Sequence, residues 1–205
     1  MRVFKKSNLY KVKTVRIIFL LFCIPPLLVS CNWFGPQPSF EDDYITYTIP
    51  LGSHETEQQS TSVFKGKSLR FQALFDSSSV YAASSPENQF DINKLMGFSD
   101  CSSLHHQNSA RFGWNWYDGA LHIFAYTYVN GDRIVQELGT AEISKPLVYE
   151  IHIQENQYRF VFNGQETIMK RHCTGGAGLA YNLYPYFGGD ETAPHEIKIK
   201  IRFLE

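Results

Sequence analysis

The sequence predicts an all-β domain in which two antiparallel sheets pack face to face. The first observation is alternation: between Leu147 and Gly164, apolar residues recur at every second position, as on the buried face of a pleated strand. The second is turn chemistry, because Asp118-Gly119, Asn130-Gly131 and Asn163-Gly164 favour tight hairpins. The third is that hardly any segment beyond residue 40 has a helical period. There is thus no room for the crossover helices that parallel strands need.

About ten strands are expected in chain order. Residues 90–98 fit either one helical turn or a strand. Trp114 and Trp116 are expected in the core, because Arg111, Gly113 and Asn115 alternate against them. The final strand alternates isoleucines with lysines. The expected strands are residues 44–49, 63–75 with a bend at 65–67, 109–117, 121–129, 133–138, the hairpin 147–164, 168–172, 179–187 and the final strand 196–204, with polar loops at 53–62, 77–88, 139–146 and 188–194.

The first 30 residues have the pattern of a secretory signal peptide. Residues 1–16 carry six basic side chains and no acidic one, and an apolar run, Ile17–Val29, follows. That run is shorter than the roughly 20 residues of a spanning helix, and Pro25-Pro26 interrupts it. The predicted organisation is therefore a signal peptide (1–30), a Pro- and Gly-rich spacer (31–43) and one β-sandwich domain (44–205).

The end of this segment, Leu28-Val29-Ser30-Cys31, resembles the lipobox of bacterial lipoproteins. The resemblance implies cleavage before Cys31, diacylglycerol on its thiol and a further acyl chain such as palmitate on its amino group. Several acyl chains would hold the protein stably in a lipid bilayer. Asn32, where some bacteria use Asp for inner-membrane retention, favours the outer membrane, in a leaflet that the sequence leaves open. The alternative is an ordinary signal peptide with a coincidental cysteine.

The charge of the expected mature chain argues against nucleic acid as a partner. Residues 1–30 hold six of the 19 basic residues and none of the 20 acidic ones, so 13 basic residues remain against 20 acidic. Nucleic-acid binding depends on lysines and arginines that neutralise phosphates. The remaining chain instead fits a solvated domain.

The expected domain contains two cysteines, Cys101 and Cys173. An exported location permits a disulfide between them, which would close a loop of about seventy residues and add roughly 4 kcal/mol in the chain-entropy model. Two buried thiols are the alternative. A zinc site with neighbouring histidines is disfavoured, because the Cys-x3-His-His spacing matches no common zinc pattern.

The long regular last strand and the hairpin Tyr-x-Ile-x-Ile…Tyr-x-Phe-x-Phe-Asn-Gly resemble the concanavalin A-like jelly roll of legume lectins, laminin-G modules and many glycan-active enzymes. The resemblance is one of pattern over residues 44–205. An immunoglobulin-like sandwich and a lipocalin-like barrel remain alternatives.

The side of the strand on which each residue lies predicts which side chains contact a ligand. In residues 121–129, His122, Tyr126 and Tyr128 oppose the aliphatic positions, and Glu150 and His152 do so in the hairpin. If the two segments are neighbours, these residues form one polar-aromatic surface with Arg159 nearby. Aromatic rings surrounded by polar groups suit the apolar faces and hydroxyls of sugars. A polysaccharide or oligosaccharide is therefore the expected ligand, and the alternative is that the rings fill the core.

Catalysis is a second hypothesis. Jelly-roll glycoside hydrolases carry Glu-x-Asp-x-Glu on one strand, and the nearest stretch here keeps Glu150 but has His152 and Gln154 at the other positions. For a polysaccharide lyase, His152, Tyr126, Arg159 and His122 are candidate bases or carboxylate-neutralising groups. The Arg-x-Glu-x-Arg and Gln-x-His strands of jelly-roll alginate lyases are missing. Glu150 and His152 are thus the catalytic candidates only if the protein is an enzyme.

Two loops are further candidates. His105 and His106 lie in the polar stretch 100–108 and could line a ligand pocket. Asp190 and Glu191, in the Gly-rich stretch 188–195, could hold a structural Ca2+, although a tight turn is the more ordinary reading and no other cofactor is indicated.

The sequence therefore predicts an envelope-anchored lipoprotein that binds a glycan without cleaving it. The first alternative is a glycan hydrolase or lyase. The second is a structural lipoprotein that docks another envelope protein through its aromatic face.

Overall fold

Twelve strands and two short 3₁₀ helices make up the regular structure of residues 43–205, the part of the chain that the computed structural model describes. The predicted signal peptide, Cys31 and residues 32–42 of the expected spacer lie outside the described residues. The elements are β1 (Ile45–Ile49), β2 (Val63–Phe64), β3 (Ser68–Phe75), η1 (Ser77–Ser79), η2 (Pro86–Phe90), β4 (Asn93–Ser99), β5 (Asn108–Tyr117), β6 (Ala120–Val129), β7 (Asp132–Ala141), β8 (Leu147–Gln154), β9 (Gln157–Phe162), β10 (Gln165–Lys170), β11 (Ala180–Leu183) and β12 (Ile197–Phe203).

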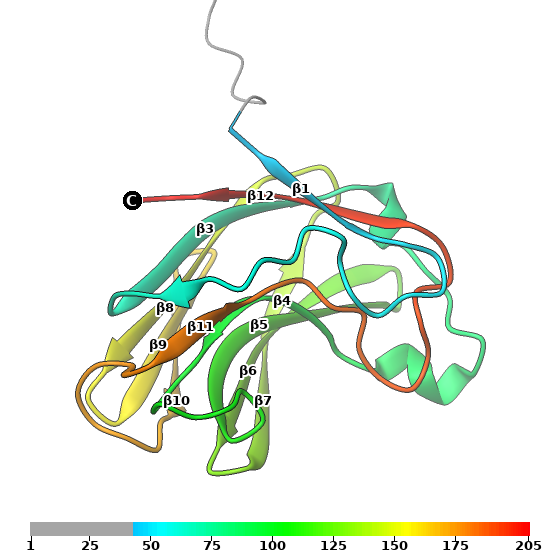
Figure 1. Cartoon of the computed structure of the whole chain (residues 1–205). Helices are drawn as coiled ribbons and strands as arrows, with labels where there is room; N and C mark the ends of the chain where they lie inside the picture. Colours follow the sequence, from blue (N-terminus) through cyan, green and yellow to red (C-terminus); the bar gives the residue numbers. More distant parts are fainter. Residues whose placement is uncertain (1–42) are drawn as a thin grey trace, which may run out of the picture. The chain divides into compact units, whose positions relative to one another are not determined.

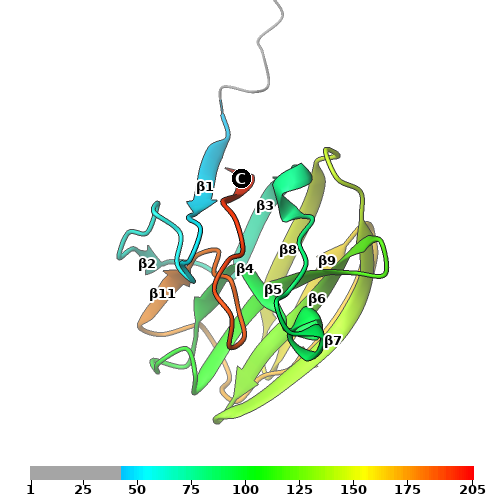
Figure 2. The ribbon, with the colours of Figure 1, turned by 90° about the vertical axis from the view of Figure 1, so that its right-hand side faces the viewer.

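The strands form two six-stranded antiparallel sheets (Figure 1). The first sheet has the order β1-β12-β3-β8-β9-β10, and the second has the order β2-β11-β4-β5-β6-β7. Figure 2 shows the two layers, with β5, β6 and β7 curving beneath β3, β8 and β9. The predicted antiparallel sandwich is confirmed.

The hairpin turns lie where the sequence predicted them. Asp118-Gly119 joins β5 to β6, Asn130-Gly131 joins β6 to β7, and Asn163-Gly164 joins β9 to β10. Both residues of each pair have positive φ, between 48° and 92°. This is the conformation of the type I′ turn, whose twist matches that of the flanking strands.

Several element boundaries differ from the prediction. For residues 90–98 the strand alternative is correct, because β4 begins at Asn93 and η2, which precedes it, already ends at Phe90. Strand β7 runs on to Ala141, where a loop was expected, since it stays paired with β6 across a register shift at Ile123/Phe124. Regular pairing in the predicted strand 179–187 is confined to β11.

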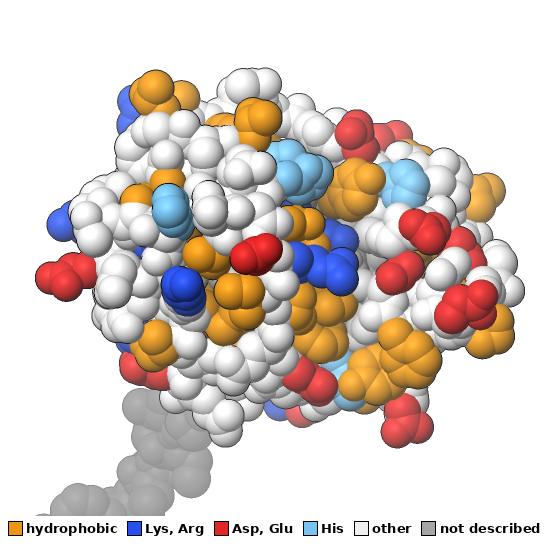
Figure 3. All heavy atoms as spheres, turned by 90° about the horizontal axis from the view of Figure 1, so that it is seen from below, with side chains coloured by type: hydrophobic (Ala, Val, Ile, Leu, Met, Phe, Trp, Pro, Cys, Tyr) orange, Lys and Arg blue, Asp and Glu red, His pale blue; other side chains and the backbone are white. Residues whose placement is uncertain are grey.

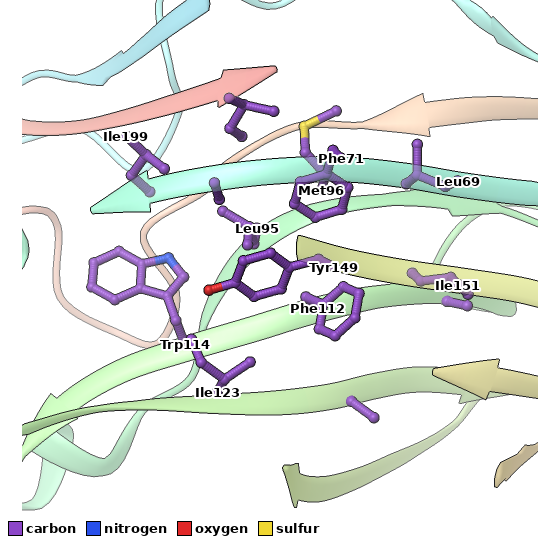
Figure 4. Close-up of a cluster of buried hydrophobic side chains, with 14 of the residues drawn as sticks. Leu69, Phe71, Leu95, Met96, Phe112, Trp114, Ile123, Tyr149, Ile151 and Ile199 are labelled. Carbon is purple, nitrogen blue, oxygen red and sulfur yellow. The ribbon is translucent and has the colours of Figure 1, made fainter. Parts of the chain in front are cut away.

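The core lies between the sheets and is rich in aromatic rings (Figure 4). Phe112 from the second sheet makes edge contacts with Phe71 and Tyr149 from the first, with ring centroids 5.9 and 5.1 Å apart. Such edge-to-face pairs add about 0.5–1.5 kcal/mol each beyond the area that they bury. Trp114 is fully buried beside Phe75, 5.4 Å between centroids, so its predicted place in the core is confirmed.

Within residues 43–205, no helix combines the length and hydropathy of a membrane span.

Candidate functional site

The outer face of the second sheet gathers basic and aromatic side chains. In β5, Phe112 and Trp114 point into the core, which places Arg111 on the opposite face. In β6 the core residues Leu121, Ile123 and Ala125 leave the opposite face to four aromatic side chains, His122, Phe124, Tyr126 and Tyr128. Strands β5–β7 lie at the lower side of the domain in Figure 1. Figure 3 looks at that side and shows basic side chains among apolar ones near its centre.

We call Lys94, Arg111, Tyr126, Tyr128 and Arg133 the basic groove. A pocket of about 250 Å³ opens here, and its lining residues are Phe90, Asp91, Ile92, Lys94, Tyr126, Arg133, Val135 and Gly189. They come from η2 and the segment after it, from β4, β6 and β7, and from the loop that precedes β12. The groove therefore depends on segments that are distant in the sequence.

Two glycines permit close approaches that build the groove. A Cβ atom on Gly97 would lie 2.1 Å from the Cβ of Arg111, so only glycine lets β4 pack beside that arginine. Gly189 has φ of +85°, and a Cβ there would meet the Asp91 carboxylate at 1.9 Å. A larger residue at either position would displace the groove wall.

The three cations of the groove have no carboxylate partner. The ion pairs that lysines and arginines make within residues 43–205 involve Arg70, Lys145, Arg159, Arg171 and Lys198, and none involves a groove cation. Lys94 donates from Nζ to the carbonyl of Ile92 at 2.6 Å. Arg111 donates to the carbonyls of Leu95 and Tyr184 at 3.1 and 2.6 Å. The groove thus holds net positive charge in a domain that is acidic overall.

Burial and mutual repulsion destabilise these charges. Burial, with smaller contributions from Arg111 and Arg133, lowers the pKa of Lys94 to about 8, although the Asp91 carboxylate opposes this shift. Burial also lowers the pKa of Arg111 to about 10, although Tyr126, Tyr186 and Tyr128 oppose this shift. Its buried Nε has no hydrogen-bond partner among the described residues. An anionic ligand in the groove would supply negative charge that stabilises the charged forms of Lys94 and Arg111.

Two tyrosines lie side by side on β6 next to these cations. The rings of Tyr126 and Tyr128 are 5.8 Å apart between centroids, and Lys94 Nζ lies 5.2 Å from the Tyr126 ring centroid. Burial, followed by the neighbouring Tyr128, raises the pKa of Tyr126 to about 12, and Arg133 acts in the opposite direction. Tyr126 is therefore a neutral phenol at ordinary pH, able to donate a proton or a hydrogen bond.

The β4–β5 loop brings His105 and His106 to the same face. The rings of His106 and Tyr128 are 5.4 Å apart between centroids. His105 Nδ1 lies 2.9 Å from the hydroxyl of Tyr181 on β11. Burial, and then the neighbouring His106 and Arg111, lowers the pKa of His105 to about 4, so this imidazole is neutral at pH 7.

A buried network holds the base of this loop. Cys101 and Cys173 form a disulfide with Cα atoms 5.7 Å apart. Beside it, the fully buried Asp100 accepts hydrogen bonds from Arg171 Nε at 2.6 Å, Arg171 Nη2 at 3.0 Å and the Tyr158 hydroxyl at 2.5 Å. The bidentate pair and the disulfide together tie the loop to the segment that follows β10.

Of the six predicted ligand-binding residues, the structure brings five, His105, His106, His122, Tyr126 and Tyr128, to the outer face of the second sheet. His122 lies towards the other end of β6, where its Nδ1 is 2.7 Å from a Glu137 oxygen.

The expectation of one shared surface with Glu150, His152 and Arg159 is wrong. These three residues lie on β8 and β9 of the first sheet, whereas residues 121–129 form β6 of the second. Arg159 pairs with Glu166, and Glu150 accepts hydrogen bonds from Arg70 at 3.0 Å and His152 at 2.8 Å. Alternation gave the facing within each strand correctly, but it carries no information about which sheet a strand joins.

The prediction also missed the groove cations Lys94, Arg111 and Arg133. Arg111 was noted only because it alternates with the tryptophans of β5. A useful signal was that Arg111 lies in a strand that is otherwise mostly buried, on the face opposite to the core residues Phe112 and Trp114. Buried positions of this kind rarely carry a charge without a reason.

Asp190 and Glu191 remain a calcium prediction. The Glu191 carboxylate accepts hydrogen bonds from Ser84 N, Ser85 N and Asn88 Nδ2 at 2.7 to 2.9 Å, so it fixes the segment around η2. In the described part of the chain, the one group of three potential metal ligands is Asp100, Cys101 and Cys173, whose two sulfurs are bonded to each other.

A larger hollow of about 560 Å³ lies elsewhere, along the edges formed by β1, β2 and β3. Its lining includes Tyr47, Ser60, Ser62 and Tyr184, whose hydroxyl is 2.7 Å from that of Ser62. Its one arginine, Arg70, is already paired with Glu150. Its other cation, Lys65, is exposed and makes no ion pair within residues 43–205, so the hollow holds one unpaired cation where the basic groove gathers three, and the smaller pocket is the better candidate site.

No protein-family model matches the chain, and no curated protein matches it in sequence. Solved structures do match in fold. An alginate lyase from a Chlorella virus aligns with a TM-score of 0.52 and 10% identity, covering 78% of this chain and 82% of that one. The laminarinase catalytic domain from Thermotoga maritima gives 0.52 and 10%, covering 78% and 76%.

A third similar structure is a GH16 protein of the mixed-linkage glucan locus of Bacteroides ovatus, with a TM-score of 0.51 and 6% identity over 78% of this chain and 81% of that one. All three span most of this chain and share its pair of antiparallel sheets. The fold of this protein is therefore the concanavalin A-like jelly roll that the strand pattern predicted.

Proposed function

We propose that this domain is a polysaccharide lyase that binds a uronate-containing chain in the basic groove. The observation that carries the proposal is the group of three cations that make no ion pair with a carboxylate of residues 43–205, Lys94, Arg111 and Arg133, beside the paired phenols of Tyr126 and Tyr128. A polymer of negatively charged sugars supplies the missing counter-charge. This replaces simple glycan binding, the hypothesis that the sequence favoured, with its enzyme alternative.

The chemistry would be β-elimination. Cations that neutralise the uronate carboxylate make the C5 proton more acidic, because they stabilise the carbanion-like charge that develops there. A base removes that proton, the electron pair forms the C4–C5 double bond, and the C4–O bond breaks. The leaving oxygen takes a proton from an acid. We assign the acid to Tyr126, which its raised pKa keeps protonated, and the base to the more accessible Tyr128, whose phenolate oxygen would take the C5 proton.

Hydrolysis has less support from the site. Retaining glycosidases need two carboxyl groups about 5 Å apart. The pocket lining contains one carboxylate, Asp91, and Glu137 on the same face is engaged by His122. The similar structures include both an alginate lyase and glucan hydrolases, and the charge of the groove favours the first kind.

The test uses the purified full-length chain on acidic polysaccharides (alginate, polyglucuronate, polygalacturonate) and on the neutral glucan laminarin. Retention, ultraviolet absorbance of unsaturated ends and new reducing ends are followed together. We expect unsaturated ends with at least one acidic polymer. Lys94→Met should lose most of this activity, whereas Lys145→Met, an exposed lysine paired with Glu142, should keep it. Retention without product would return the domain to a glycan binder. Cleavage of laminarin without unsaturated ends would indicate a hydrolase, and no interaction with any polymer would favour a protein-docking role.

We also propose that the protein works outside the cytoplasm, held in a membrane by lipid on Cys31. The signal-like residues 1–30 and the lipobox support this, and the Cys101–Cys173 disulfide fits an oxidising compartment. Metabolic labelling with a palmitate analogue should label the wild-type chain and not Cys31→Ser. Equal labelling of the two chains, or none, would contradict the anchor while leaving the lyase proposal untouched.

A further inference from the structure

We propose that Phe90, Tyr117 and His122, with the carboxylate of Glu137, form a second sugar subsite that takes an uncharged pyranose ring next to the uronate in the basic groove. The inference rests on the proposed function and names its substrate class: a polymer in which a uronate alternates with a neutral sugar. We call these four residues the aromatic platform.

The platform is a continuous set of rings at the end of β6 that precedes the groove tyrosines. Tyr117 stacks on His122 with ring centroids 3.6 Å apart and an interplanar angle of 13°. Phe90, at the end of η2, lies 5.5 Å from Tyr117 between centroids. Phe90 is 64% exposed, so much of its ring is open to solvent although it contacts Tyr117. Exposed ring faces suit the C–H face of a pyranose.

The platform is continuous with the groove. Phe90 lines the same pocket as Lys94, Tyr126 and Arg133. His122 and Tyr126 are four residues apart on one face of β6, which corresponds to roughly 13 Å along the strand. His122 is therefore the distant end of the platform, and Phe90, which lines the pocket itself, is the part that the ring next to the uronate reaches.

The charge changes sign between the two places. Glu137 accepts from His122 at 2.7 Å and lies 3.4 Å from the Tyr117 hydroxyl, so its carboxylate is held at the edge of the rings. Asp118 directly follows Tyr117 and is exposed. The platform residues include no lysine or arginine. A second uronate would meet negative charge here, whereas a neutral sugar could offer its hydroxyls to the carboxylate as hydrogen-bond donors.

The test compares two polymers that share glucuronate: polyglucuronate, in which every ring is charged, and hyaluronan, in which glucuronate alternates with uncharged N-acetylglucosamine. Retention and unsaturated ends are measured for the full-length wild type, Phe90→Ala, Glu137→Gln and the control Phe203→Ala. Phe203 is another exposed phenylalanine, 46% accessible, on the first sheet.

We expect the wild type to prefer the alternating polymer. Phe90→Ala should raise KM on it about five- to tenfold with kcat within about twofold, because stacking holds the substrate without taking part in the chemistry. Glu137→Gln should improve KM on polyglucuronate by about fivefold and erase the preference, since a charge repulsion is removed. Phe203→Ala should behave as wild type.

If the wild type cleaves but Phe90→Ala matches Phe203→Ala, or polyglucuronate is the better substrate, the subsite is wrong and the lyase stands. If polymers are retained but never cleaved, the lyase is wrong, and weaker retention by Phe90→Ala still supports the subsite. If neither polymer is retained or cleaved, both proposals fall.

Discussion

The outer faces of the two sheets use charge in opposite ways. On the first sheet, Arg70 pairs with Glu150, which also accepts from His152, and Arg159 pairs with Glu166. On the second, the cations of the basic groove have no carboxylate partner, and burial lowers the pKa of Lys94 and Arg111. Arg202 on β12 of the first sheet also makes no ion pair with a carboxylate in the described part of the chain, but it donates to Gln72. The second sheet instead gathers Lys94, Arg111 and Arg133 in one groove, where Asp91 is the one carboxylate that lines the pocket.

The difference separates a solvated surface from a site. Exposed ion pairs contribute little to stability, so a face on which charges pair needs no functional explanation. Lys94 is half-buried and Arg111 is buried, and a cation without a carboxylate partner in such a place costs free energy, a cost that persists mainly where a ligand offsets it. In the sequence, the outward-facing residues of the two sheets are similar in type, so the two surfaces could not be told apart.

The largest effect is expected at Tyr128. Tyr128→Phe removes the proposed base but keeps the ring, so kcat on an acidic polymer should fall about 10²- to 10⁴-fold with little change in KM. Steady-state formation of unsaturated ends measures this. Tyr44→Phe is the control on the first sheet, where the Tyr44 hydroxyl bonds Gln72, and it should keep full activity. Equal activity of the two variants would remove Tyr128 from the chemistry.

The second-largest effect is expected from the disulfide that links the two sheets. The Cys101–Cys173 disulfide joins the histidine loop of the groove face to the segment after β10 of the first sheet. The double variant Cys101→Ser/Cys173→Ser should lower the free energy of unfolding by about 2–5 kcal/mol, because the unfolded chain loses a long cross-link. Denaturant unfolding of both proteins, with and without reductant, measures it.

Reductant should destabilise the wild type and leave the double variant unchanged. The Asp100–Arg171 pair next to the disulfide is expected to keep the loop folded in the absence of ligand. The double variant should therefore keep most of its activity under conditions in which it is still folded. A midpoint of unfolding that is equal in all four samples would show that the buried ion pair alone fixes the loop.

A smaller effect is expected from pH. The Lys94 pKa of about 8 means that the free protein loses this positive charge as pH rises through 8, so the affinity for an acidic polymer should fall about tenfold from about pH 7 to about pH 9. Lys94→Arg stays charged over this range and should flatten the profile. Retention on immobilised polyuronate at constant ionic strength measures it. A profile that falls equally in Lys94→Arg would assign the titration to another group.

The sequence predicted the features that depend on neighbouring residues and missed those that depend on contacts between distant segments. Alternation and Asp-Gly or Asn-Gly turns are local, so they predicted the strands, the hairpins and the facing of β6 correctly. The joining of β6 and β8 to different sheets is decided by contacts between distant segments, which no local pattern records. Lys94 enters the groove through the packing of β4 beside Gly188 and Gly189, again a long-range event. The sequence shows that these cations are present, but it does not show that folding brings them together.

The smallest expected effect tests that lesson directly. Glu150 and His152 were the catalytic candidates from the sequence, yet they lie on the first sheet, where Arg70 completes their hydrogen bonds. Partial burial raises the pKa of Glu150, but hydrogen bonds from His152 and Arg70 outweigh this and lower it, which is unlike a catalytic acid. Glu150→Gln and His152→Ala should therefore change kcat/KM by less than about twofold and stability by no more than about 1 kcal/mol. Activity assays and thermal unfolding of both variants, beside Tyr128→Phe, measure this. Loss of cleavage in Glu150→Gln with the fold intact would move the active site to the first sheet and overturn the contrast between the two faces.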